Sequence, residues 1–177
     1  MWYCSNLNIC VAVNKDVVPI KNLLNMAYRG ETSKQGWTSE ADLIAGDTRA
    51  DEKTVQEVMQ QTGSIFLIYK SNQQKIIGCI NIQQLHSSIN LGMFSVLPHL
   101  QGAGIGKQLL LAAEEFAQHI NINAIYMSVI SLRTELIDWY NRCGYMDTGE
   151  RKPFNEDGLT GNHLKKLEFM VLKKIKT

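Results

Sequence analysis

A run of glycines ahead of a leucine-rich segment is the most distinctive chemical feature of this sequence. Within HLQGAGIGKQLL (99–110), glycines stand at positions 102, 104 and 106, and Lys107 follows at once. The first N–H groups of a helix have no internal partner, and the helix dipole adds partial positive charge there. The run is therefore expected to hold a phosphate or pyrophosphate group. A glycine-rich turn that only joins a strand to a helix is the alternative.

Two nucleotide-binding motifs with similar glycines do not fit this spacing. A P-loop ending at Lys107 requires glycine at position 101 and serine or threonine at position 108, but glutamine occupies both positions. The dinucleotide fingerprint would accept Gly102 and Gly104, yet its third glycine falls on Lys107. The glycine run is therefore expected to serve another kind of phosphate ligand.

The hydrophobic pattern predicts the elements that must position this run. Apolar residues at helical spacing indicate helices, and runs rich in isoleucine, valine and aromatic residues indicate strands. The predicted helices cover residues 16–30, 51–61, 107–119 and 132–142. The predicted strands cover residues 9–13, 64–70, 75–84, 89–97, 123–130, 145–152 and 164–173. The polar segment between the first two helices shows no period and is expected to be irregular.

This element order predicts an α/β fold of the mixed α+β kind. Short turns join the three strands within 64–97 and make them an antiparallel meander. The helix at 107–119 is then the crossover to a parallel strand at 123–130. We expect one domain over residues 1–177, built on a mixed sheet with helices on its faces.

Composition limits the classes of partner. The chain has 18 basic and 17 acidic residues, so it lacks the basic surface typical of nucleic-acid binding. Its four cysteines and four histidines are scattered, and no metal site is expected. The N-terminus is a poor signal peptide, and no stretch approaches the roughly 18 apolar residues of a membrane span. A soluble, cytoplasmic protein with no membrane partner is expected.

The glycine run also fits a third motif. Gln101, Gly104 and Gly106 match every fixed position of Q/R-x-x-G-x-G/A, and Val96 begins V-x-P just before it. This pattern resembles motif A of the Gcn5-related N-acetyltransferase (GNAT) family, over roughly residues 76–145. The resemblance implies acetyl-CoA as cosubstrate, with no metal. It also implies a GNAT-type fold, in which about four helices flank a mostly antiparallel mixed sheet of about six to seven strands.

The resemblance assigns the cofactor contacts residue by residue. In this family the strand before the loop splays from its neighbour, and its backbone pairs with pantetheine. The implied pyrophosphate contacts are Gln101, Gly102, Ala103, Gly104, Ile105, Gly106 and Lys107, and the implied pantetheine contacts are Phe94, Ser95 and Val96. Arg133 stands where many members place an asparagine, and it could reach a phosphate of coenzyme A.

Tyr140 stands four residues before Gly144 and Tyr145, as does the general acid of many family members. A phenol, with a pKa near 10, can protonate a thiolate whose thiol has a pKa near 8.5. A core tyrosine on an amphipathic helix is the alternative reading. Ser128 occupies the position where some members carry a glutamate base, so the base must lie elsewhere.

In this fold the segment between the first two helices lines the acceptor groove. Its carboxylates Glu40, Asp42 and Asp47 are the candidate bases, and Glu40 is the one we select. Trp37, Glu40 and Asp42 are the candidate acceptor contacts, with Trp37 as an apolar wall. The acidic character of this segment favours a cationic small molecule.

The expected activity is transfer of an acetyl group from acetyl-CoA to a primary amine by direct attack. The acceptor is a small molecule or a peptide, and a homodimer is left open. Two alternatives remain. One is a coenzyme A-binding sensor or interaction module without catalysis, and the other is an acyltransferase that uses a different acyl-CoA.

Overall fold

The structure, a computed structural model, describes residue 2 and residues 4–176, so residues 1, 3 and 177 of the expected domain lie outside the described residues. The helices are α1 (Val17–Tyr28), α2 (Gly30–Ser33), α3 (Glu52–Gln60), α4 (Ile105–His119) and α5 (Thr134–Arg142), with 3-10 turns at Asn14–Asp16 and Pro98–Leu100. The strands are β1 (Ile9–Val11), β2 (Ile44–Ala45), β3 (Ser64–Lys70), β4 (Ile76–Gln84), β5 (Ser88–Val96), β6 (Ala124–Ile130), β7 (Met146–Pro153), β8 (Asn162–His163) and β9 (Glu168–Ile175).

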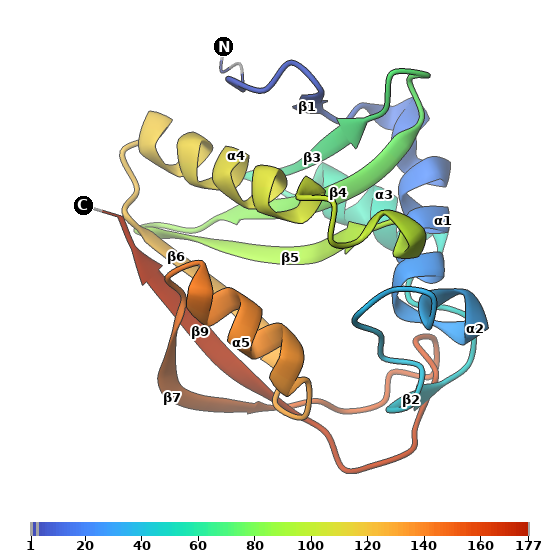
Figure 1. Cartoon of the computed structure of the whole chain (residues 1–177). Helices are drawn as coiled ribbons and strands as arrows, with labels where there is room; N and C mark the ends of the chain where they lie inside the picture. The colour runs from blue at the N-terminus through green and yellow to red at the C-terminus, as the bar shows by residue number, and fades with distance from the viewer. Residues whose placement is uncertain (1, 3, 177) are drawn as a thin grey trace.

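The described strands form a seven-stranded sheet in the order β1-β3-β4-β5-β6-β9-β7 and a small sheet of β2 and β8. Every pair in the larger sheet is antiparallel except β5 with β6, which α4 joins as a crossover (Figure 1). The predicted mixed, mostly antiparallel sheet and its single parallel step are thus confirmed.

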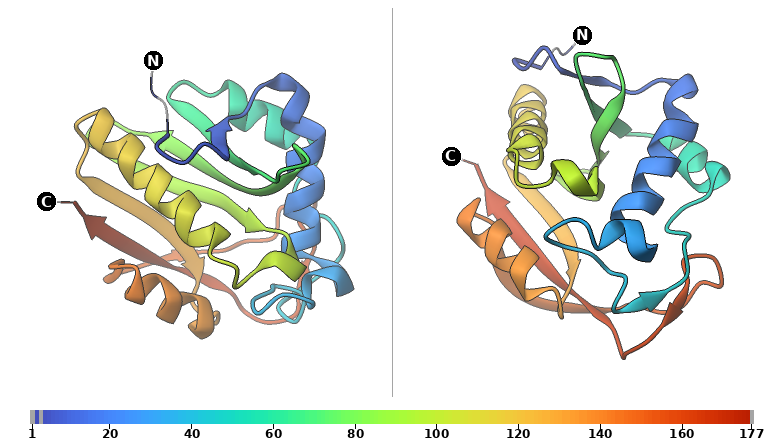
Figure 2. Two further views of the ribbon diagram at one scale, coloured as in Figure 1. Left: turned by 45° about the horizontal axis from the view of Figure 1, so that its top comes forward. Right: turned by 45° about the vertical axis from the view of Figure 1, so that its right-hand side comes forward.

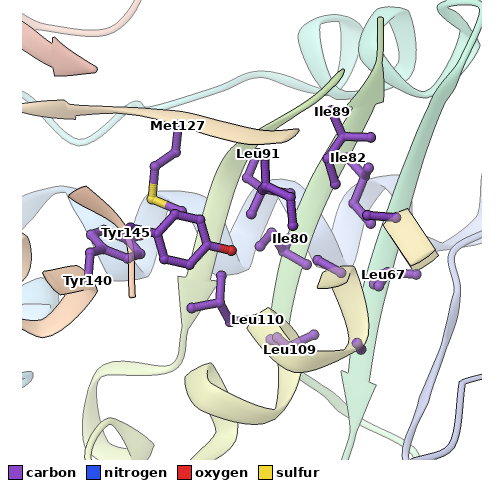
Figure 3. Close-up of a cluster of buried hydrophobic side chains, with 14 of the residues drawn as sticks. Leu67, Ile80, Ile82, Ile89, Leu91, Leu109, Leu110, Met127, Tyr140 and Tyr145 are labelled. Carbon is purple, nitrogen blue, oxygen red and sulfur yellow. The ribbon is translucent and has the colours of Figure 1, made fainter. Parts of the chain in front are cut away.

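Alternation along the central strands places helices on both faces of the sheet. On β3, Leu67 faces one core cluster, whereas Phe66 and Ile68 face another, as the two-residue period of a strand requires. The first cluster packs against α4 and α5, and the second packs against α1 and α3. Figure 2 shows α4 lying across one face, and Figure 3 shows Leu109 and Leu110 of α4 against the strands.

Three short elements were not predicted. Gly30, expected to end the first helix, has a φ of +65° and begins α2, while α1 ends at Tyr28. The expected irregular segment after it contains β2, which pairs with β8. The last strand runs over 168–175 instead of 164–173, because residues around His163 pair with the segment around Ile44. This pairing ties the long loop before β9 to the segment that follows α1.

None of the helices in the described part of the chain is both long and apolar enough to span a membrane.

Candidate functional site

The parallel strands β5 and β6 separate halfway along their length. Their pairing runs from Ser88 with Ala124 to Leu91 with Met127 and stops there, although β5 continues to Val96. Figure 1 shows the two strands diverging toward the glycine loop. A bulge in the pairing with β4, where Met93 has a φ of +43°, accompanies this separation. Beyond Leu91, β5 is therefore open on the side that faces β6.

Backbone groups of β5 point into this gap. The carbonyl of Phe94 accepts a hydrogen bond from the Tyr28 hydroxyl at 2.9 Å, and the carbonyl of Val96 accepts one from the Gln101 amide at 3.3 Å. In an extended strand the N–H and C=O of one residue point to the same side. The N–H groups of Phe94 and Val96 therefore also face the gap, where β6 offers no partner.

The glycine loop ends in a left-handed residue that opens the start of α4. Gly104 is the N-cap of α4 with a φ of +84°, a conformation that a side chain would strain. The backbone N–H groups of Gly104, Ile105, Gly106 and Lys107 donate to no described backbone carbonyl. Unpaired N–H donors at the start of a helix, together with the helix dipole, are suited to an anionic ligand.

A cavity of about 280 Å³, here called the donor pocket, lies between this loop and the open part of β5. Its lining includes all but two of the predicted cofactor contacts: Phe94, Ser95, Val96, Gln101, Gly102, Gly104, Gly106, Lys107 and Arg133. The exceptions are Ala103, which is exposed, and Ile105, whose side chain packs in the core. Ile105 can contribute only its backbone N–H to a ligand in this pocket.

Gly106 lines the donor pocket and, because it has no side chain, leaves room for the cavity. A Cβ atom there would lie 3.6 Å from the Phe94 ring, 3.8 Å from Trp139 and 3.8 Å from Val96, all of which line the pocket. One methyl group would fit at ordinary contact distance, but a larger side chain would project into the cavity. The sequence did not single out Trp139, whose helical spacing is equally typical of a core residue.

Tyr140 lies where α5 meets the gap. Its ring packs 6.3 Å from Phe94 and 6.1 Å from Tyr145, and Figure 3 shows it at the edge of the core cluster. It lines the donor pocket, and its hydroxyl makes no hydrogen bond to the described residues. Burial raises the pKa of Tyr140 well above its ordinary value. The phenol is therefore protonated at neutral pH, and the same shift makes it a weaker proton donor than a free tyrosine.

Glu40 lies in a buried ion network. One of its carboxylate oxygens accepts from Arg29 and the other accepts from Arg133 at 3.0 Å. Arg133 also donates to the Thr38 hydroxyl at 2.7 Å. The Arg29 side chain is fully buried, so Glu40 neutralises a charge that has no access to water. Both oxygens of the selected base are thus already engaged.

The other predicted acceptor contacts are dispersed. Trp37 lines the donor pocket, where its ring lies 6.4 Å from that of Trp139. Asp42 is exposed, pairs with Lys34 at 3.4 Å and lines neither this cavity nor the one beside it. Asp47 is exposed and lines neither cavity as well. Within the described residues, the structure does not bring these carboxylates together.

Comparison with known proteins places the chain in a family. The family described as "Acetyltransferase (GNAT) domain" matches residues 38–168. The chain therefore belongs to the GNAT family of acetyltransferases, as the glycine motif predicted. Among curated proteins no match was found.

Solved structures share the fold at low sequence identity. The ribosomal-protein-S18-alanine N-acetyltransferase from Escherichia coli is 13% identical with a TM-score of 0.70, covering 96% of this chain and 94% of that one. A ribosomal-protein-alanine N-acetyltransferase from Brucella melitensis is 18% identical with a TM-score of 0.70, covering 96% and 100%. The structure of yncA from Salmonella typhimurium with its cofactor acetyl-CoA is 18% identical with a TM-score of 0.67, covering 97% and 94%.

Proposed function

We propose that this protein transfers an acetyl group from acetyl-CoA to a primary amine. The observation that carries the proposal is the donor pocket, in which one cavity joins the unpaired N–H groups of α4 to the open backbone of β5. A pyrophosphate needs the first feature, and the amide-bearing pantetheine arm needs the second. Acetyl-CoA carries both groups and supplies an activated acetyl thioester.

The glycine loop would bind the anionic part of the donor. The N–H groups of residues 104–107 point outward with no backbone partner, and Lys107 adds a cation at the same wall. The Phe94 and Val96 backbone would align the pantetheine arm in the gap. To do so, the Tyr28 hydroxyl and the Gln101 amide, which now bind the two carbonyls, would exchange partners with the ligand.

The reaction itself needs a polarised carbonyl, a free amine and a proton for the leaving sulfur. A β5 N–H in the gap would polarise the thioester carbonyl. As the amine attacks the carbonyl carbon, the C–N bond forms, the C–S bond breaks and the sulfur leaves as a thiolate. Tyr140, which burial keeps protonated, would give its proton to that sulfur. The attacking nitrogen would lose its remaining extra proton to water, and the Tyr140 phenolate would regain a proton from water.

Glu40 and Arg133 are better suited to positioning than to chemistry. Glu40 is the single carboxylate among the described residues that line the two cavities, and Arg29 and Arg133 hold both of its oxygens. The guanidinium of Arg133 donates hydrogen bonds to Glu40 and Thr38. The resemblance implied a contact with a phosphate of coenzyme A instead. We therefore infer that the acceptor amine loses its proton to water, with no side chain as direct base.

Release of free thiol from acetyl-CoA in the presence of a panel of amines tests this proposal. The expected result is amine-dependent thiol release that saturates with acetyl-CoA. Tight binding of acetyl-CoA without turnover on any amine would contradict catalysis, and would favour a coenzyme A-binding module.

A further inference from the structure

A second cavity adjoins the donor pocket on the β6 side of the gap. This acceptor pocket, of about 210 Å³, shares five lining residues with the donor pocket: Tyr28, Phe94, Arg133, Leu136 and Tyr140. Its lining runs along β5 from Asn90 to Phe94 and along β6 from Met127 to Ile130. The shared wall includes Tyr140, so ligands in the two cavities would lie beside the same phenol.

The charge of the acceptor pocket is positive. Arg49 and Arg133 line it against the single described carboxylate Glu40, and Arg29 binds the same carboxylate from behind. The guanidinium groups of Arg29 and Arg133 bind this carboxylate, and Arg49 adds a third positive charge. Arg133 is bound to Glu40, whereas no described carboxylate lies within salt-bridge distance of Arg49.

Arg49 is held with its hydrogen-bond donors available. Its guanidinium carbon lies 5.2 Å from the centroid of the Tyr28 ring. This is a cation–π contact, and no described residue accepts a hydrogen bond from the guanidinium N–H groups of Arg49. The same Tyr28 ring has Arg133 over it at 5.8 Å, so both arginines of the pocket lie against one aromatic side chain. A partly buried, oriented and unpaired guanidinium suits bidentate binding of a carboxylate.

The rest of the wall limits the shape of the ligand. The rest of the lining includes apolar residues from three strands and two uncharged polar residues: Leu91, Met127, Val129, Ile130, Phe169, Asn90 and Ser128. The apolar residues provide a surface for a short apolar group, and none of these residues is a carboxylate that could pair with a second cation. A polyamine would therefore place positive charge beside arginines and hydrocarbon, which disfavours it.

We propose that the acetyl acceptor is a small amine bearing a carboxylate, an α-amino acid, whose carboxylate binds Arg49. Its amine would face the gap at the end of β5, and its side chain would lie on the apolar wall. The proposal rests on the transferase function proposed above. It replaces the cationic acceptor that the acidic segment suggested, because Glu40 and Asp42 are engaged by arginine and lysine.

The test compares each proteinogenic α-amino acid with its own carboxamide, and includes spermidine as a cationic amine. Thiol release gives KM and kcat, and calorimetry measures binding of the same compounds to the enzyme–coenzyme A complex. We expect at least one amino acid to be preferred over its amide by about tenfold or more, the loss typical of a charged hydrogen bond. Arg49→Gln should raise KM for that acid by about tenfold and leave the amide within about twofold.

Two further variants separate charge recognition from general damage. Arg49→Lys should recover part of the preference, since it restores the charge without the fork. Lys53→Gln, which removes a cation from the exposed surface of α3, should change nothing. Thermal melting of each variant confirms that it folds.

Equal use of acid and amide, preference for spermidine, or equal loss of both substrates in Arg49→Gln would overturn the proposal. Absence of both binding and turnover for every amino acid would overturn it too. Turnover of amines without any preference for a carboxylate would leave the transferase function standing. Arg49-dependent binding of amino acids without turnover would instead support the pocket and contradict the transferase.

Discussion

Arg133, just before α5, donates a hydrogen bond to Glu40 at 3.0 Å, although 93 positions separate them in the sequence. Arg29, just after α1, binds the same carboxylate. Glu40 therefore fastens the end of α1 to the start of α5, which are the elements on either side of the gap. Both cavities of the site depend on where these elements lie.

Replacing Glu40 with glutamine should reduce stability more than it alters chemistry. The change would leave the fully buried Arg29 without its counter-charge, and breaking a buried pair in this way costs about 3–5 kcal/mol. Chemical denaturation measures the loss, and Glu31→Gln at an exposed surface pair is the matched control. A stable Glu40→Gln protein whose kcat alone collapses would instead identify Glu40 as the base.

Substitution of Gly106 should separate a small side chain from a larger one. Alanine places its methyl at ordinary contact distance from Phe94, Trp139 and Val96, so coenzyme A should still bind. Valine projects into the donor pocket, and we expect it to weaken coenzyme A binding by about tenfold or more. Calorimetry with coenzyme A checks both variants, and equal affinities would show that the donor does not pass Gly106.

The activity should rise with pH according to the acceptor amine. Only the neutral amine attacks, and no free described carboxylate or histidine lines the two cavities. Because the pKa of Tyr140 is raised above its ordinary value of 10.0, loss of the phenol proton should not produce a falling limb below pH 10.

Profiles of kcat/KM against pH for two acceptors with different amine pKa values provide the measurement. The rising limb should move with the acceptor. A limb that stays at one pH for both acceptors would indicate a titrating base on the enzyme.

The sequence predicted the donor side of the site more fully than the acceptor side. The spacing of Gln101, Gly104 and Gly106 could be interpreted from the sequence because the loop and the start of its helix lie within a few residues of one another. The parallel pairing of β5 with β6 was also predictable, because a helix that connects two strands usually joins parallel neighbours. These features need no knowledge of distant contacts.

The acceptor side depends on contacts between distant segments. Arg49 lines the acceptor pocket beside Tyr28, which lies 21 positions earlier in the sequence, and nothing in its own neighbourhood marks it. Glu40 looked like a free acid in a polar segment, and its partners at 29 and 133 appear only after folding. Sequence spacing carries no signal for such pairs.

Tyr140→Phe tests the central claim most directly, because it removes one oxygen from the donor pocket and leaves the ring packing. Steady-state thiol release should show kcat lower by about 10²–10⁴-fold with coenzyme A affinity unchanged, as for loss of a general acid. Tyr145→Phe, which removes the hydroxyl of a neighbouring buried tyrosine that lines neither cavity, is the control for altered packing. An unchanged kcat in Tyr140→Phe would contradict the account.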